Sequence, residues 1–459
     1  MTEVPHKSVA GVVWPDIAGE THRAQLLSLL QQFGTSERWS ADLLLQNQLR
    51  QLALVIDHAY RTVPFYRGRL SAAGYRSGQA VTPDWLRTLP LLTRRNIQDA
   101  GAALHSTAVP PQFGAVHENR TSGATGQPVQ VLRTALDGLL WQANTLRDHA
   151  WHQRDQSLKL AAIRALAPGI ADPPLGVTAS GWGAASEAVR TTAPSALLTL
   201  SADIAVQAAW IGQFAPGYLL TYPGNLAALL AYFAQKGERL PGLRAVLTVG
   251  ETVAPALRAA CRDTLGVNIE DVYSSQELGY IALQCPVSGQ YHVMAESVLV
   301  EVLNPAGQPC APGETGRLVI SSLHDYAMPL IRYELRDYAT VGTPCACGRT
   351  LPTLAAIAGR ERNMVRLPDG TTHWPLVGFH RFREIAPVRQ YQLIQHALQA
   401  VEVRLVCDRA LTAAEESELG AVICTALGYP FELRFAYYEG ELPRAANGKF
   451  EEFVSRLAQ

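Results

Sequence analysis

The chain has 459 residues, enough for one large domain and a smaller one, each with its own core. Its 39 basic and 40 acidic side chains leave a net charge of -1, so no global field draws it to nucleic acid or to an anionic membrane. It has no signal-peptide core and no apolar stretch of about 18 residues, which predicts a soluble cytoplasmic protein.

Helices are predicted for most of the N-terminal region. In residues 43–60 (LLLQNQLRQLALVIDHAY) apolar side chains recur every three or four positions, as on the buried face of a helix. From Val116 onward, short β-like runs alternate with helices, which indicates α/β layering with parallel strands. The series begins with the β-like run TLRDHAWHQ and continues through GYLLTYP, NLAALLAYFAQ, LRAVLTVG, PALRAACRDTLG and NIEDVYSS.

Two further β-rich regions follow. Residues 291–341 contain strand-like segments joined by Asn-Pro and Pro-Gly turns, as in an antiparallel β-meander. The C-terminal region holds the β-run VEVRLVC, the acidic helix TAAEESELGAVICTALG and the β-run FELRFAYY. The predicted fold is therefore α/β, with layered α/β subdomains and a β-meander in a large N-terminal domain and a small α+β domain at the C-terminus.

Residues 121–128 (TSGATGQP) form a loop rich in glycine and hydroxyl groups. Two glycines let the backbone turn tightly and expose its amides, and the hydroxyls add donors, so the loop can wrap the phosphates of a nucleotide. Loops of Ser, Thr and Gly are also common turns, and the segment alone fits either interpretation. The loop is not of the Walker type, because it lacks a Gly-Lys-Ser/Thr ending.

Polar groups follow three apolar runs, at residues 249–251 (VGE), 273–277 (YSSQE) and 332–337 (RYELRD). A nucleotide site needs one carboxylate for magnesium, another for the ribose hydroxyls and a flat surface for the base. Glu277, Asp337 and Tyr273 can supply these three groups. Each acidic residue has an ordinary alternative as a solvated turn or cap residue.

Near the C-terminus, residues 442–450 (LPRAANGKF) form a turn that presents Lys449. The turn can be a plain surface loop. Alternatively, Lys449 enters a site and neutralises charge that develops between a carboxylate and an α-phosphate.

A second set of residues is suited to a metal. Cys285, His292, Cys345 and Cys347 offer three thiolates and an imidazole, which satisfy tetrahedral zinc, and they flank the predicted β-meander. Unligated buried thiols are the alternative. Four protein ligands make a closed, structural site.

In this order and spacing the motifs resemble those of the adenylate-forming superfamily of acyl-CoA synthetases, adenylation domains and luciferases, and within it the phenylacetate-CoA ligase branch, where similar cysteine clusters occur. The resemblance covers nearly the whole chain. It rests on the N-terminal signatures 63–67 (VPFYR) and 89–93 (LPLLT), the phosphate loop 120–123 (RTSG) and the hinge motif Gly359-Arg360.

The resemblance implies a role for each matching residue. The phosphate loop contacts phosphates, Glu277 binds magnesium, and Lys449 serves adenylation as a catalytic residue. Residues 1–358 form the large domain and residues 359–459 a small mobile domain that rotates about Arg362. The implied nucleotide contacts are Thr121, Ser122, Gly123, Thr125 and Gly126 for phosphates, Gly250, Glu251, Tyr273 and Ser274 for adenine, and Asp337 with Arg360 for ribose.

The expected reaction is ATP-dependent activation of an aryl or other apolar acid to an acyl-adenylate, followed by transfer to the thiol of CoA or of a phosphopantetheine carrier protein. Residues 364–375 lack the Gly-Val-Asn-hydrophobic-Pro pattern of the phenylacetate enzymes, which favours an amine or another nucleophile as the alternative acceptor. A non-catalytic ATP-binding scaffold is the third hypothesis. The expected partners are a small carboxylic acid, a carrier protein and a second copy of the chain in a homodimer, with neither nucleic acid nor membrane.

Overall fold

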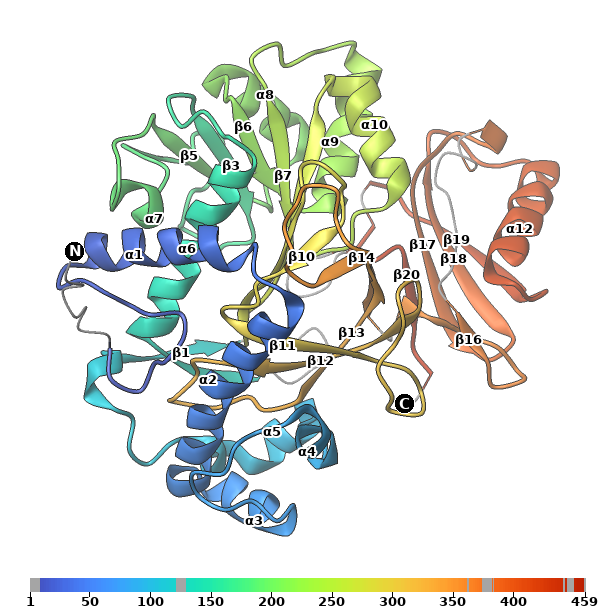
Figure 1. The fold of residues 1–459 in the computed structure, drawn as a ribbon. Helices are drawn as coiled ribbons and strands as arrows, with labels where there is room; N and C mark the ends of the chain where they lie inside the picture. Colours follow the sequence, from blue (N-terminus) through green and yellow to red (C-terminus); the bar gives the residue numbers. More distant parts are fainter. Residues whose placement is uncertain are drawn as a thin grey trace. The chain divides into compact units, whose positions relative to one another are not determined.

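The structure is a computed structural model that describes residues 9–120, 129–360, 363–373, 382, 384–440, 442–443 and 450–457 (Figure 1). The chain forms two compact units. The first comprises Met1–Leu160, Thr178–Ala196 and Glu270–Ile357. The second comprises Ala161–Val177, Leu197–Ile269 and Ala358–Gln459. The division into domains 1–358 and 359–459 stays a prediction.

The first unit begins with the predicted helices. Ser40 caps α2 by accepting a hydrogen bond from the Leu43 N–H, and the expected helix over residues 43–60 lies within α2. None of the helices in the described part of the chain combines the length and the apolar character needed to cross a bilayer. The helices are α1 (His22–Ser36), α2 (Ala41–Thr62), α3 (Pro64–Ala72), α4 (Pro83–Thr88), α5 (Arg94–Ala100), α6 (Ala135–Trp151) and α7 (Ala184–Glu187), with the 3-10 turns η1 (Gly101–Leu104) and η2 (Pro111–Phe113).

The β-like interpretation of TLRDHAWHQ is wrong, because this segment forms the end of α6. Leu146 and Trp151 are buried, and so are the charged side chains of Arg147 and Asp148. The buried face of α6 therefore includes polar positions that an apolar pattern does not reveal. Figure 1 shows α6 beside α1, and the two helices share a core that includes Leu29, Phe33 and Ala143.

The strands of the first unit follow the order β11-β12-β13-β14-β10-β9-β8. β11, β12 and β13 pair antiparallel, which confirms the predicted meander. A separate antiparallel hairpin, β1 (Val116–Arg120) with β2 (Gln130–Thr134), leads into α6. The sheet strands are β8 (Asn268–Ser275), β9 (Gly279–Gln284), β10 (Tyr291–Val293), β11 (Val298–Leu303), β12 (Thr315–Ser322), β13 (Tyr333–Val341) and β14 (Thr353–Arg360).

The second unit contains the α/β alternation expected from the sequence. β6 and β7 pair in parallel, and α9 connects them, as in a βαβ unit. β4 (Val177–Ala179) and β5 (Ser195–Thr199) cross the boundary between the units. The other elements of this part are β3 (Leu160–Arg164), α8 (Ile204–Phe214), β6 (Tyr218–Thr221), α9 (Pro223–Lys236), β7 (Ala245–Val249) and α10 (Pro255–Leu265).

The C-terminal part has the predicted α+β composition. Its sheet has the order β19-β18-β17-β20, and α12 packs on it through Leu419, Ile423 and Leu427 (Figure 1). Thr412 and Glu415 form a capping box at the start of α12. The elements are β15 (Val365–Arg366), β16 (Thr372–His373), β17 (Val388–Ala397), β18 (Ala400–Cys407), α12 (Ala413–Leu427), β19 (Glu432–Tyr437) and β20 (Phe453–Ser455).

Candidate functional site

The predicted site residues are distributed over both units. Tyr273, Ser274, Glu277 and Asp337 belong to the first unit, whereas Gly250, Glu251 and Arg360 belong to the second. The other residues predicted for the nucleotide site and the hinge lie outside the described residues; they are Thr121, Ser122, Gly123, Thr125, Gly126, Arg362 and Lys449.

Two predicted nucleotide contacts of the first unit meet directly. Tyr273 lies near the end of β8, and its hydroxyl donates a 2.7 Å hydrogen bond to the Asp337 carboxylate on β13. Asp337 is buried and Tyr273 half-buried. An ionised aspartate accepts up to about four hydrogen bonds. The pair can therefore present an aromatic face and an acceptor side by side.

Both N-terminal signature motifs brace the segment that leads to Asp337. The Tyr66 hydroxyl donates to the Pro329 carbonyl (2.9 Å) and accepts from the Ile331 N–H (3.1 Å). The backbone of Leu92 pairs with that of Tyr333 in a parallel bridge. The signatures thus act through main-chain contacts that hold residues 329–333 in place.

Arg332 completes this support. Its guanidinium donates to the Arg87 and Leu89 carbonyls and to the Glu301 carboxylate. Arg332 has φ +52° and Arg336 has φ +61°. Non-glycine residues rarely adopt such angles, so the surrounding contacts hold the backbone in a strained form next to Asp337.

Glu277 lies in the turn between β8 and β9, next to two arginines that the sequence interpretation missed. Arg94 Nη1 is 3.7 Å from the Glu277 carboxylate. Arg133 Nη1 donates a 2.6 Å hydrogen bond to the Glu277 main-chain carbonyl. Arg94 directly follows the signature 89–93, which is the one signal that could have pointed to it. Arg133 has no comparable signal in the sequence.

In the second unit, Glu251 links two segments of the chain. Its carboxylate accepts from the Gly224 N–H at the start of α9 (2.7 Å) and from the Phe450 N–H (3.1 Å). A Cβ at Gly224 would lie 3.0 Å from the Phe450 Cβ, so the close approach requires glycine there. Glu251 thus contacts the residue that follows Lys449. Gly250 has φ +80°, and Arg360 is exposed at the end of β14.

Three aromatic residues that could contact an aryl acid, Trp141, Trp182 and Tyr222, have different environments. Trp141 is 43 % exposed and packs against Tyr280, with ring centroids 4.4 Å apart. Trp182 donates from its indole nitrogen to the Leu158 carbonyl, and Tyr222 is buried in the second unit. Of the three, Trp141 is the most exposed.

The four predicted metal ligands converge. Their ligand atoms all lie within 4.8 Å of one another. Cys285 Sγ is 3.7 Å from Cys345 Sγ, and Cys347 Sγ is 3.3 Å from His292 Nε2. In a tetrahedral site with zinc–sulfur bonds of about 2.3 Å, two sulfurs lie about 3.8 Å apart. The spacing therefore fits zinc.

Two of the four side chains, His292 and Cys285, have pKa shifts that suit a metal. Burial lowers the pKa of His292 to about 4, which leaves its imidazole neutral. Burial raises the pKa of Cys285, but N–H groups of Ser288 and Val287 outweigh it and bring that pKa to about 7. His292 Nδ1 lies 3.5 Å from the Leu351 carbonyl, which directs Nε2 toward the thiols.

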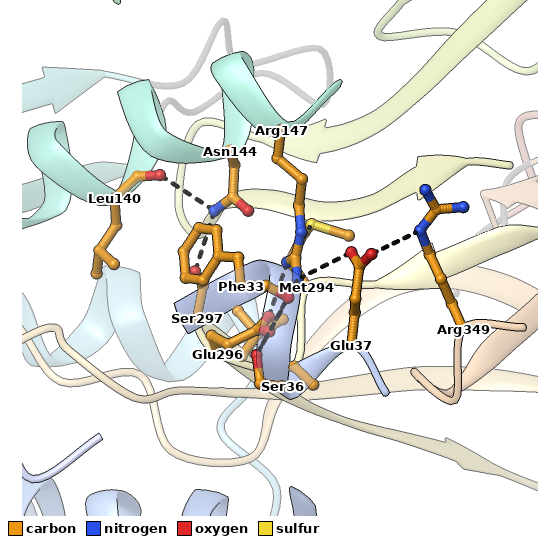
Figure 2. Close-up of polar contacts among 12 residues, drawn as sticks. Phe33, Ser36, Glu37, Leu140, Asn144, Arg147, Met294, Glu296, Ser297 and Arg349 are labelled. Atoms are coloured by element: carbon orange, nitrogen blue, oxygen red, sulfur yellow. Dashed lines mark hydrogen bonds and ion pairs between the residues drawn. The ribbon is translucent and has the colours of Figure 1, made fainter. Parts of the chain in front are cut away.

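A buried charge network adjoins the metal cluster (Figure 2). Arg147 on α6 donates from both Nη atoms to Glu296, at 2.8 and 2.9 Å. Glu37 after α1 lies 3.7 Å from Arg147 and 3.2 Å from Arg349. Arg349 follows Cys347 by two positions, so the ligand turn and the two helices share one set of ion pairs.

The fold has known structural relatives. The fold is that of adenylate-forming enzymes: the chain aligns with 2-hydroxyisobutyryl-CoA ligase in complex with 2-HIB-AMP over 92 % of each chain, with a TM-score of 0.74 and 18 % identity. It also aligns with an anthranilate-CoA ligase in complex with anthranoyl-AMP, over 80 % of this chain and 69 % of that one, with a TM-score of 0.53 and 17 % identity.

Sequence comparison narrows the class. The chain is 28 % identical over 339 residues to phenylacetate-coenzyme A ligase of Escherichia coli (strain K12), covering 72 % of this chain and 74 % of the relative. It is 25 % identical over 338 residues to the same enzyme of Pseudomonas putida, with 72 % and 73 % covered. No protein-family model matches the chain. The chain is thus a homologue of phenylacetate-CoA ligases, which confirms the predicted resemblance.

Proposed function

We propose that this protein is an AMP-forming acid–CoA ligase, which activates a carboxylic acid with ATP, releases pyrophosphate and transfers the acyl group to the thiol of CoA. Four curated relatives that carry the name phenylacetate-coenzyme A ligase support this activity. The geometric observation that carries the proposal is the hydrogen bond between Tyr273 and Asp337, because it joins the residues assigned to base and ribose.

In the proposed first step the substrate carboxylate attacks the α-phosphate of ATP, and pyrophosphate leaves. Tyr273 offers its ring to the adenine, and Asp337 accepts hydrogen bonds from the ribose hydroxyls. Holding both reactants in line supplies much of the acceleration. Lys449 neutralises charge at the transferring phosphoryl group. Because the product is a mixed anhydride that water hydrolyses, the site must exclude water until the acceptor arrives.

Glu277 is the residue assigned to magnesium. Its side chain is 12 % exposed, and its carboxylate lies 3.7 Å from Arg94 Nη1. Carboxylate oxygen is a ligand that magnesium prefers. When bound, magnesium stabilises charge on the phosphate oxygens. The hydroxyl-rich loop 121–128 is assigned to the phosphates themselves.

A structural zinc ion at Cys285, His292, Cys345 and Cys347 belongs to the same proposal. The four ligands fill a tetrahedral shell and leave no open position for substrate, so the metal has no part in the reaction. It fixes the turns at 285–292 and 345–350 instead. The small domain 359–459, with Arg362 as its hinge, is proposed to carry Lys449 into and out of the site between the two steps.

The proposal is tested by acid-dependent exchange between ATP and labelled pyrophosphate, with a panel of aryl and aliphatic acids. We expect exchange with at least one acid, and we expect the highest exchange rates with aryl or other apolar acids. Absence of exchange with every acid would favour a non-catalytic scaffold. A second assay then tests for a thioester with CoA and with a phosphopantetheine carrier protein. A thioester with either one indicates a thiol acceptor, and a thioester with neither indicates an amine or another nucleophile.

A further inference from the structure

Arg133, at the end of β2, gathers three acceptors from separate segments of the first unit. Its Nη1 donates to the Glu277 carbonyl at 2.6 Å and to the Asp325 carboxylate at 3.1 Å. Its Nη2 lies 3.4 Å from Asp137, in the first turn of α6. The side chain is 14 % exposed. One guanidinium thus joins the β8–β9 turn, the β12–β13 connection and α6.

The turn that carries Glu277 packs against this guanidinium. Gly279 has φ +76°, and a Cβ there would lie 3.5 Å from Arg133 Nη2 and 3.5 Å from the Trp141 ring. The Ser275 hydroxyl accepts from the Leu278 N–H and closes the turn. Arg133 therefore holds the Glu277 main-chain carbonyl, and Arg94 Nη1 lies 3.7 Å from the Glu277 carboxylate.

Two buried aspartates, Asp137 and Asp325, hold the Arg133 guanidinium in place. Asp137 also accepts from the Thr134 N–H (2.7 Å) and hydroxyl (2.9 Å), which anchors it to the start of α6. Burial raises the pKa of Asp325 well above its usual value, and Arg133 opposes that shift. Burial would lower the pKa of Arg133, but Asp137 and Asp325 outweigh it, so Arg133 stays charged. A charged arginine with carboxylates on two sides has little freedom to change its orientation.

We propose that Arg133 is a positioning residue for adenylation, which fixes the direction in which the Glu277 carboxylate meets a divalent cation. The inference rests on the proposed function, in which Glu277 binds magnesium. Misplacement of a ligand by a fraction of an ångström weakens a magnesium site, because this ion demands near-ideal octahedral geometry. A purely structural Arg133 would affect stability and leave the magnesium requirement unchanged.

The test measures the free Mg²⁺ concentration that gives half-maximal pyrophosphate exchange, with ATP and the acid saturating. Arg133→Lys keeps the charge but loses the planar fork that reaches several acceptors at once. Arg133→Met combined with Asp325→Leu removes the guanidinium together with one of its two buried carboxylates, while Asp137 keeps its hydrogen bonds from the Thr134 N–H and hydroxyl. Arg317→Met is the control, since Arg317 pairs with Glu334 at 3.1 Å within the meander.

We expect the half-maximal Mg²⁺ concentration to rise about threefold in Arg133→Lys and about tenfold or more in the double variant, with the KM for the acid within about twofold of wild type. The control should keep the wild-type Mg²⁺ requirement. Wild-type Mg²⁺ requirements in both Arg133 variants would overturn the inference and leave the proposed function standing. A wild-type protein that exchanges with no acid would overturn the proposed function and this inference together.

Discussion

Tyr273 and Asp337 lie 64 positions apart in the sequence, and the hydroxyl of the first donates a hydrogen bond to the carboxylate of the second. β8 and β13 are not neighbours in the sheet order, so this contact is made by side chains and not by strand pairing. The hydroxyl fixes the orientation of Asp337. The contact therefore ties the assigned base surface to the assigned ribose acceptor.

Tyr273→Phe should raise the KM for ATP about tenfold and leave the KM for the acid unchanged. The ring remains for stacking, whereas a hydrogen bond to a charged group is worth about 1.5–3 kcal/mol. Steady-state exchange kinetics give both constants. Tyr291→Phe is the matched control, because the Tyr291 hydroxyl donates to Asp271 at 2.6 Å on a different part of the sheet. Equal effects of the two substitutions on ATP would contradict the assignment.

Cys345→Ser should lose the bound metal and lower the unfolding temperature by about 5 °C or more, because the turns at 285–292 and 345–350 lose their common ligand. Elemental analysis of freshly purified protein and a thermal melt provide the two measurements. Cys310→Ser, which alters a cysteine outside the cluster, should change neither. Wild-type protein without zinc would refute the metal assignment.

Lys449→Ala should reduce acyl-adenylate formation by about a hundredfold or more, the usual loss when one preorganised charge-stabilising group is removed. Binding of ATP should be largely kept. Exchange kinetics and equilibrium ATP binding separate the two effects. Lys236→Ala, at the end of α9, is the control and should behave as wild type. If Lys449→Ala formed the acyl-adenylate at the wild-type rate, Lys449 would not be a catalytic residue.

The elements that were predicted correctly are those with a recognisable local pattern in the sequence. The apolar spacing in residues 43–60 gives a helix, the turn chemistry of residues 291–341 gives a meander, and cysteine spacing brings Cys285 and Cys345 together. Tyr273 and Asp337 were selected as polar residues at the ends of strands. Tyr273 does lie near the end of β8, whereas Asp337 lies within β13, so the strand-end rule holds for the first residue and not for the second.

The features that the sequence did not predict depend on contacts between distant charged residues. Arg147 is 149 positions from Glu296, and no local pattern pairs them. The helix at TLRDHAWHQ was not predicted for the same reason. Its buried face includes the charged residues Arg147 and Asp148, so the apolar spacing of a helix is absent there. Arg133 was missed for the same reason, because two of its three partners lie 144 and 192 positions away.

Arg147→Met should lower the free energy of unfolding by about 3–5 kcal/mol, because it leaves the buried Glu296 and Glu37 carboxylates without their shared cation (Figure 2). Urea denaturation measures the change. Combining it with Glu296→Leu should restore part of the loss, since the pair is then replaced by apolar groups. A single variant as stable as wild type would show that the network contributes little.

Acidification should destabilise the fold through buried neutral histidines. Burial, followed by the charge of Arg154, lowers the pKa of His149 to about 4, and burial lowers that of His324 to about 4. Arg154 Nη1 lies 2.8 Å from His149 Nδ1, which must therefore be an unprotonated acceptor.

At pH values between the ordinary histidine pKa of about 6.5 and the folded value of about 4, these histidines are protonated in the unfolded chain and neutral in the folded chain. The free energy of unfolding should therefore fall as the pH drops from 7 to 5, by at most about 1.4 kcal/mol per pH unit for each histidine. Urea denaturation at pH 7, 6 and 5 measures the slope. His149→Gln keeps an acceptor for Arg154 without titrating, so its slope should be shallower; an unchanged slope would mean that His149 does not contribute.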